Sequence, residues 1–191
     1  AYITNGEQII KGDSLFYDRN KSYGKAINNI AIIDSLNKII VNGNLAEYFE
    51  EEDKVEVTKS ALLNLIMEKD TLFITAEKFI SVSAESKYIT ASPDVKIYKK
   101  DLQGKCDSLH YSISDSIIEL FYHPVLWADD MQIMSDSIQI NILKQKIESM
   151  NFYPNSIIIS KADSLHYNQI KGKYMTAWFN KNKLKKLDVF G

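Results

Sequence analysis

The chain has 191 residues, of which 45% are hydrophobic and 25% are charged, and its formal net charge is −2. With only 7 Gly and 3 Pro, this composition excludes collagen-like and low-complexity chains and is that of an ordinary folded protein. The small net charge gives no general attraction to nucleic acid, and no apolar run reaches the roughly 18 residues of a membrane-spanning helix. The 11 Tyr, 8 Phe and abundant Ile favour strands, in which aromatic and β-branched side chains pack well.

Six short segments resemble one another from end to end of the chain. They cover residues 12–17, 43–48, 69–74, 106–111, 135–140 and 162–167. Each has Asp or Asn, usually a hydroxyl residue, then an aliphatic residue, a variable residue and Tyr or Ile; the copy at 43–48 matches least well. Successive Asp or Asn positions are 26 to 37 residues apart, with the longest step between Asp70 and Asp107. A unit of about thirty residues that recurs along the whole chain predicts an elongated array, not a globule around an active site.

Apolar residues alternate with polar ones inside these segments, which predicts strands. The residues that share one strand face are Leu15 with Tyr17, Leu72 with Ile74, Leu109 with Tyr111, Ile138 with Ile140, and Leu165 with Tyr167. Further alternating stretches lie between the segments, at 30–32, 55–57, 95–97, 125–127 and 157–159. Each unit is therefore expected to hold strands joined by short polar turns.

Three prolines recur with the same spacing of about thirty residues, independently of the Asp motif. Pro93, Pro124 and Pro154 are 31 and 30 residues apart, and each precedes an alternating apolar stretch. Because proline has no N–H for a sheet ladder, it is tolerated at the first residue of a strand or on an edge. Each proline is therefore expected to mark a strand entrance.

Two stretches, 60–69 and 142–150, have helix propensity, but their place within the repeat favours strands. No Gly/Ser-rich linker divides the chain, so residues 1–191 are interpreted as one continuous domain of roughly a dozen strands. Its abrupt ends favour a fragment of a longer exported protein. The expected fold class is all-β, an open and twisted antiparallel slab of two facing sheets, similar to a jelly roll. Its interior is a packed core if the sheets close tightly, and a lipid groove if they splay apart.

This pattern resembles the OstA-like family, whose members carry lipopolysaccharide through the periplasm toward the outer membrane of Gram-negative bacteria. The segment 12–17 matches the family's Gly-Asp-x-Leu-x-Tyr element, residues 25–32 and 40–44 look like its partner strand, and 123–127 resembles its Asn-Pro-x-x-Trp strand. The resemblance implies a periplasmic, non-enzymatic module without cofactor or metal. It also implies binding of lipid A acyl chains inside a V-shaped slab, and edge-to-edge association with itself or with other OstA-like domains.

On this interpretation the lipid-binding groove consists of the aliphatic and aromatic residues at the repeated strand phase. They are Leu15, Tyr17, Leu72, Ile74, Leu109, Tyr111, Trp127, Ile138, Ile140, Leu165 and Tyr167. Lipid phosphates are expected to contact lysines in the basic stretch 171–186. The candidates are Lys171, Lys173, Lys185 and Lys186. The alternative for this stretch is an exposed hairpin whose lysines discourage edge pairing.

The sequence favours an enzymatic function less than a binding function. His110, His123 and His166 are the acid–base or metal candidates, but His110 and His166 occupy the same repeat position, which favours a structural role. No HExxH, nucleophile elbow, P-loop or GxGxxG motif is present, and the acidic runs 50–53 and 129–130 are interpreted as solvated turns. A glycan lyase or hydrolase with carboxylates clustered in a groove stays an open alternative.

Two further alternatives concern the single cysteine and the function as a whole. Cys106 cannot form an intramolecular disulfide and has no Cys or His at ligand spacing, so a structural role is expected. The second class of function is a purely structural or adhesive β-repeat scaffold of the cell envelope. It predicts a sealed core and no bound lipid, whereas a lipid carrier predicts an accessible apolar groove.

Overall fold

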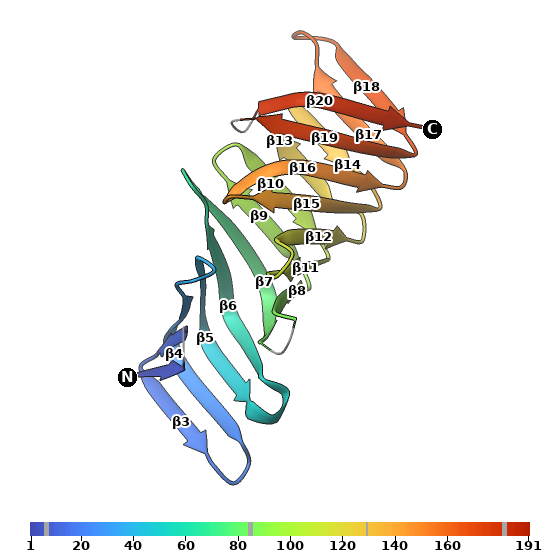
Figure 1. The fold of residues 1–191 in the computed structure, drawn as a ribbon. Coiled ribbons are helices and arrows are strands. Elements are labelled where there is room, and N and C mark those ends of the chain that lie inside the picture. The colour runs from blue at the N-terminus through green and yellow to red at the C-terminus, as the bar shows by residue number, and fades with distance from the viewer. Residues whose placement is uncertain (6–7, 84–85, 129, 181–182) are drawn as a thin grey trace.

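The structure is a computed structural model that describes all residues except 6–7, 84–85, 129 and 181–182. It is an elongated all-β slab with the two termini at opposite ends (Figure 1). The first strands are β1 (Tyr2–Asn5), β2 (Gln8–Lys11), β3 (Ser14–Asp18), β4 (Tyr23–Asp34), β5 (Ile39–Phe49), β6 (Lys54–Ile66) and β7 (Thr71–Val82). They are followed by β8 (Tyr88–Ser92), β9 (Val95–Lys99), β10 (Leu102–Cys106), β11 (Ser108–Ser112), β12 (Ile117–Phe121), β13 (Val125–Ala128) and β14 (Met131–Met134). The last are β15 (Ser137–Leu143), β16 (Lys146–Tyr153), β17 (Ser156–Lys161), β18 (Tyr167–Gly172), β19 (Tyr174–Asn180) and β20 (Lys183–Phe190).

The described residues thus form twenty strands and one short 3-10 helix, η1 (Glu50–Glu52). The all-β prediction is confirmed, and the ambiguous stretches 60–69 and 142–150 fall largely on β6, β15 and β16 as expected. The expected number of about a dozen strands was too low, because most passes of the chain break into two short strands. Within the described residues, no helix is long and apolar enough to cross a membrane.

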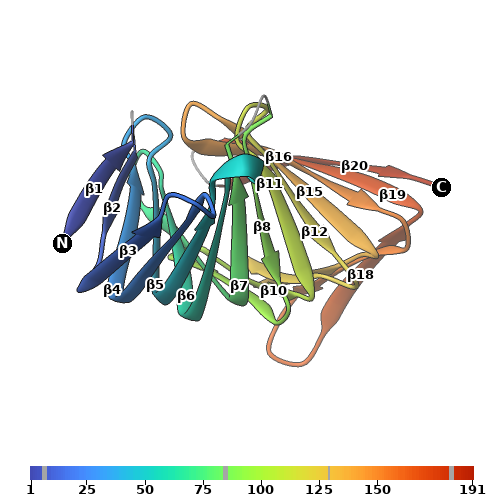
Figure 2. The same cartoon turned by 90° about the horizontal axis from the view of Figure 1, so that it is seen from below.

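The strands form two facing antiparallel sheets that are joined through the long strands β4 to β7 (Figure 2). The first sheet runs through β3, one half each of β4 to β7, and then β8, β11, β12, β15, β16, β19 and β20. The second sheet runs through β1, β2, the other halves of β4 to β7, and then β9, β10, β13, β14, β17 and β18. Each pass of the chain therefore contributes to both sheets.

The chain turns from the first sheet to the second at a row of corners with positive φ. Within the long strands these corners are Asn28–Asn29 in β4 and Lys59–Ser60 in β6. In later passes the strand ends instead, and a corner at Pro93–Asp94 or Pro154–Asn155 leads into the second sheet. Asn and Asp tolerate the left-handed region better than most residues. The prolines precede β9, β13 and β17, which confirms them as markers of strand entrances.

Four of the six similar segments lie at the return corners, where the chain passes from the second sheet to the first. These corners are at Asp13, Asn44, Asp107 and Asp136. Asp70 and Asp163 instead lie in hairpin turns at the outer margin of the second sheet, before β7 and β18. Asp followed by a hydroxyl residue can precede a strand both at a return corner and in a hairpin turn. The sequence pattern alone therefore does not distinguish a return corner from a hairpin turn.

The core lies between the sheets and is built from the inward face of each strand. Leu63, Ile74, Ile118, Leu126 and Phe152 are fully buried there. Their neighbours along each strand point outward, which is the alternation that the sequence predicts.

Candidate functional site

An open pocket of about 590 Å³ lies between the two sheets at the N-terminal end of the slab. Its apolar wall on the first sheet includes Leu15, Ala26 and Val55, and its wall on the second sheet includes Ile10 and Ile32. Ligand pockets in proteins typically measure about 300–1,000 Å³ and are mostly apolar. The pocket therefore has the size and lining of a site for an apolar group.

Small side chains in one inward row of the first sheet create this space. Leu15 pairs with Ala26, Ala26 with Ala46, and Ala46 with Val57. Toward the C-terminus the same row becomes bulky, since it continues through Phe79, Ala91, Leu109, Leu120, Ile138, Phe152 and Met175. The interior is therefore open where the row is small and filled where the row is large.

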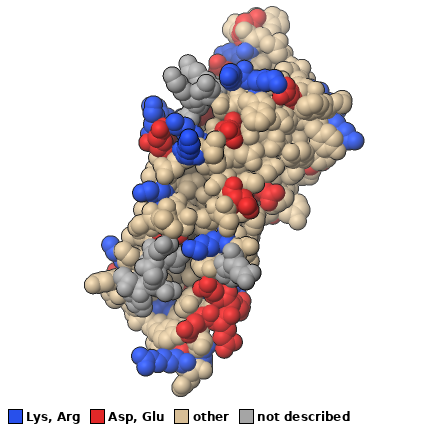
Figure 3. All heavy atoms as spheres, in the orientation of Figure 1, with Lys and Arg blue, Asp and Glu red and all other residues tan. Residues whose placement is uncertain are grey.

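The rim of the pocket carries tyrosines and an acidic turn. The hydroxyl of Tyr17 donates a hydrogen bond to the carboxylate of Glu50, and this bond raises the pKa of Tyr17 above its usual value. Glu50 belongs to η1, whose three glutamates precede Asp53, and acidic side chains gather over this part of the molecule in Figure 3. Burial raises the pKa of Tyr48, another lining residue. The entrance is thus polar while the wall behind it is apolar.

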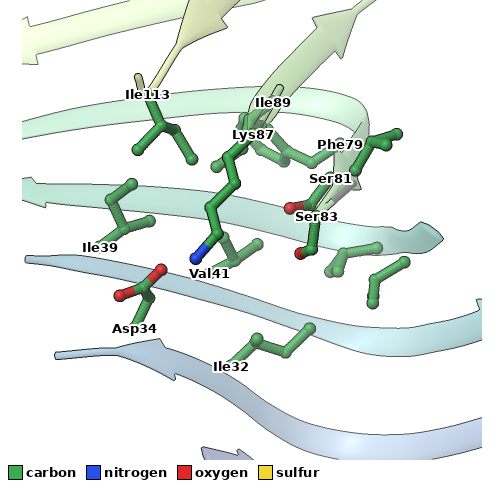
Figure 4. A pocket seen from close by; sticks show the side chains of 13 residues that line it. Ile32, Asp34, Ile39, Val41, Phe79, Ser81, Ser83, Lys87, Ile89 and Ile113 are labelled. Atoms are coloured by element: carbon green, nitrogen blue, oxygen red, sulfur yellow. The ribbon is translucent and has the colours of Figure 1, made fainter. Parts of the chain in front are cut away.

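The pocket continues inward as a narrow cavity of about 30 Å³ (Figure 4). The two share Ile32, Val55, Ser83 and Lys87 in their linings. In Figure 4 the side chain of Lys87 extends toward Asp34, which is buried at the end of β4. The Asp34 carboxylate accepts hydrogen bonds from the backbone and side-chain N–H groups of Asn37, at 2.9 and 2.7 Å. A buried carboxylate beside the turn between β4 and β5 thus lines this narrow cavity.

The margins of the two sheets meet near the middle of the slab. The turn between β6 and β7 belongs to the second sheet, and the turn between β15 and β16 belongs to the first. Lys146 Nζ lies 2.9 Å from a carboxylate oxygen of Glu68, and the Glu68 N–H donates to the carbonyl of Gln145 at 3.2 Å. We call this contact the latch. It holds the two margins together where the N-terminal pocket has already narrowed.

The structure divides the predicted groove residues into three groups. Leu15 and Tyr17 line the open pocket. Six residues are buried in the core, namely Leu72, Ile74, Leu109, Tyr111, Ile138 and Ile140. The remaining three residues are exposed, namely Trp127, Leu165 and Tyr167. Trp127 lies on the outer face of β13, beside the inward Leu126. Leu165 lies in the turn before β18, and Tyr167 is the first residue of that strand. The other pocket residues, such as Ile10, Ile32 and Val55, were missed; the small residues Ala26 and Ala46 are the signal that could have located them.

The predicted phosphate contacts lie at the opposite end of the slab from the pocket (Figure 1). Lys171 is on β18, and Lys185 and Lys186 are on β20. Lys173 lies over the ring of Tyr174 at 5.4 Å, and Lys186 Nζ is 2.9 Å from the carboxylate of Asp188. All four lysines are exposed, and they do not line the N-terminal pocket.

The three histidines lie in separate places, each beside one carboxylate. His110 contacts Glu119 at 3.3 Å on the outer face of the first sheet, and His123 contacts Asp136 at 3.5 Å at a corner. His166 contacts Asp163 at 2.8 Å in the turn before β18. Asp129 lies outside the described residues. Among the described residues, no group of three or more His, Cys, Asp or Glu side chains is placed to hold a metal ion.

Comparison with known proteins finds a likeness in fold. No protein-family model and no curated protein sequence matches this chain. The solved structure of LptH from Pseudomonas aeruginosa is similar to it with a TM-score of 0.52 and 10% sequence identity. The match covers 60% of this chain and 81% of that chain, which is described as the LptA-homologous periplasmic component of a lipopolysaccharide transport device. At this identity the likeness shows a shared LptA-like β-jellyroll fold.

Proposed function

We propose that this protein binds lipopolysaccharide, holds lipid A acyl chains between its two sheets, and helps carry them across the periplasm to the outer membrane. The observation that carries the proposal is the apolar pocket of about 590 Å³ between the sheets. The likeness in fold to a periplasmic lipopolysaccharide transport component supports it. Outer-membrane biogenesis and a periplasmic location belong to the same proposal.

Acyl chains suit such a pocket for a physical reason. Each CH₂ group that leaves water contributes about 0.8 kcal/mol, and the contact needs no directed polar partner. A chain can therefore enter at the open end, where Leu15 and Tyr17 lie, and still slide. An acyl chain can move deeper into the slab only if the two sheets move apart. Beyond Val57, the inward row of the first sheet consists mainly of bulky side chains that fill the interior.

Edge-to-edge association is part of this proposal. At the N-terminal end the sheets end in β1 and β3, and at the C-terminal end they end in β18 and β20. A terminal strand has one side of unpaired N–H and C=O groups, which is a template for a strand of another sheet. A second copy or a related domain would extend the slab in this way.

The second candidate function is a structural scaffold of the cell envelope. The observation that favours it is the closed interior in the middle of the slab, where Leu120, Ile138 and Phe152 are fully buried and the latch joins the margins. A scaffold of this kind would hold no lipid, and the N-terminal pocket would face only solvent or the next domain.

The test is photocrosslinking in a Gram-negative host with a benzoylphenylalanine residue at Tyr17. Tyr153 is the matched control, since it is a tyrosine of similar exposure (39% against 42%) on the outer face of β16, where its neighbour Phe152 points inward. Lipopolysaccharide adducts at Tyr17 but not at Tyr153 are expected. Equal adducts at both positions, or none at Tyr17 in folded and exported protein, would reject lipid binding and favour the scaffold.

A further inference from the structure

The outer face of the second sheet carries a row of aromatic and amide side chains. Paired residues on successive strands make up this row, namely Phe73 on β7, Tyr98 on β9, Gln103 on β10, Trp127 on β13 and Gln132 on β14. Adjacent strands lie about 4.8 Å apart, so rings and amides follow one another at that step along the row. Their chain neighbours Ile97, Gly104 and Leu126 are buried, which confirms that the row faces outward.

A hollow of about 550 Å³ lies beside this row. It is lined by Lys100, Asp101, Leu102, Gln103 and Trp127. The indole N–H of Trp127 donates to the side-chain oxygen of Gln132 at 3.1 Å, which orients the ring. The amide of Gln103 is exposed in the hollow and can donate and accept hydrogen bonds.

The charge around the hollow is positive. Lys105 Nζ lies 6.0 Å from the centre of the Trp127 ring, and the exposed Lys100 lines the hollow. The buried ammonium of Lys99 lies against two carboxylates, those of Asp101 and, at 3.8 Å, Asp70. Together with Lys100 and Lys105, these groups leave a net formal charge of +1 beside the hollow. The surface therefore combines an aromatic face, a free amide and two cations.

We infer that this row and its hollow form a binding site for an acidic oligosaccharide. A sugar ring has apolar C–H faces that stack on Trp127 or Tyr98, and hydroxyl groups that the Gln103 amide can bind. Lys100 and Lys105 are placed for carboxylate or phosphate groups on the sugars. Protein–protein interfaces are depleted in Lys and have an apolar centre, whereas here amides alternate with rings from Tyr98 to Gln132 and lysines flank the row. The site lies outside the two sheets and does not depend on the proposed lipid binding.

The test is isothermal titration of the whole chain with an oligogalacturonate and with a neutral malto-oligosaccharide of equal length. The acidic oligosaccharide is expected to bind more tightly, and the K100A/K105A double variant should lose this preference. Trp127→Ala is expected to weaken binding by about tenfold, the size of one aromatic contact. Trp178→Ala is the matched control because Trp178 has similar exposure (41% against 37%), lies on the other sheet, and also donates its indole N–H to a side chain.

Trp127→Phe is a second variant, since it keeps an aromatic face if Trp127→Ala does not fold, and it should retain most of the affinity. Fluorescence gives an independent readout, because in a Trp178→Phe background Trp127 is the sole tryptophan. Its emission should shift on addition of oligogalacturonate. The inference is overturned if neither oligosaccharide binds, if both bind equally, or if Trp178→Ala weakens binding as much as Trp127→Ala.

Discussion

The side-chain amide of Asn155 donates a hydrogen bond of 2.8 Å to the carboxylate of Asp136, across two corners of the slab. Asn29 makes the same 2.8 Å contact with Asp13 near the N-terminus. The N–H of Asp136 also donates to the carbonyl of Pro154, at 3.1 Å. An Asp at a return corner thus ties two neighbouring passes of the chain together where the sheet ladders are interrupted.

Asp136→Ala is expected to lower the free energy of unfolding by about 1 kcal/mol, because it removes a hydrogen bond that connects two corners. Asn155→Ala should cost a similar amount, and the double variant should cost less than the sum of the two. Urea unfolding followed by circular dichroism measures all three. Fully additive losses would show that the two side chains do not interact in solution.

Reversal of one charge in the latch is expected to affect the opening of the slab more than its stability. Glu68 and Lys146 are about half exposed, so Glu68→Lys should change the free energy of unfolding by less than about 1 kcal/mol. It should nevertheless increase uptake of a hydrophobic dye, because the margins repel each other. The swapped pair, Glu68→Lys with Lys146→Glu, should restore the original uptake. Dye binding that is equal in all three proteins would show that the latch does not control access.

Substitution by Asp is expected to destabilise the fold at the buried groove candidates but not at the exposed ones. Leu109→Asp and Ile138→Asp place an unpaired charge among fully packed side chains and should destabilise the fold by several kcal/mol, roughly 3 or more. Leu165→Asp is the control, because that side chain is 81% exposed, and it should leave the thermal midpoint unchanged. If Leu109→Asp and Ile138→Asp each left folding and lipid binding intact, the assignment of these residues to the interior would be wrong.

Cys106 is expected to make stability fall in alkaline solution. Burial raises the pKa of its thiol to about 12 from the ordinary value of 9.0, so the folded chain keeps the proton that the unfolded chain releases. Stability from this group is complete below pH 9.0 and is lost as the pH rises toward 12, at up to about 1.4 kcal/mol per pH unit. Urea midpoints of the native chain and Cys106→Ala, measured between pH 8 and 11, should diverge. The account would be contradicted if the urea midpoints of the two proteins changed equally with pH, or if a thiol reagent labelled the folded chain rapidly.

Several features were predictable because they depend on local chemistry. Proline cannot donate to a ladder, so Pro93, Pro124 and Pro154 marked entrances to β9, β13 and β17. Alternation likewise predicted that Leu109 and Ile138 share an inward face. The placement of Trp127 was not predictable in this way, because Val125 and Trp127 share the outer face of β13 while Leu126 points inward. An apolar run of three residues does not reveal which of its two faces is buried.

By itself, the sequence determined the strands, the positions of many turns and the all-β slab, since period-two alternation and turn residues act over a few neighbours. Only the tertiary structure decided where the interior is open and where it is closed. That outcome depends on contacts between distant segments, such as Ala26 beside Ala46 in the pocket wall and Glu68 against Lys146 in the latch. Such contacts arise from sheet pairing and from the way the two sheets face each other, and both are properties of the whole fold.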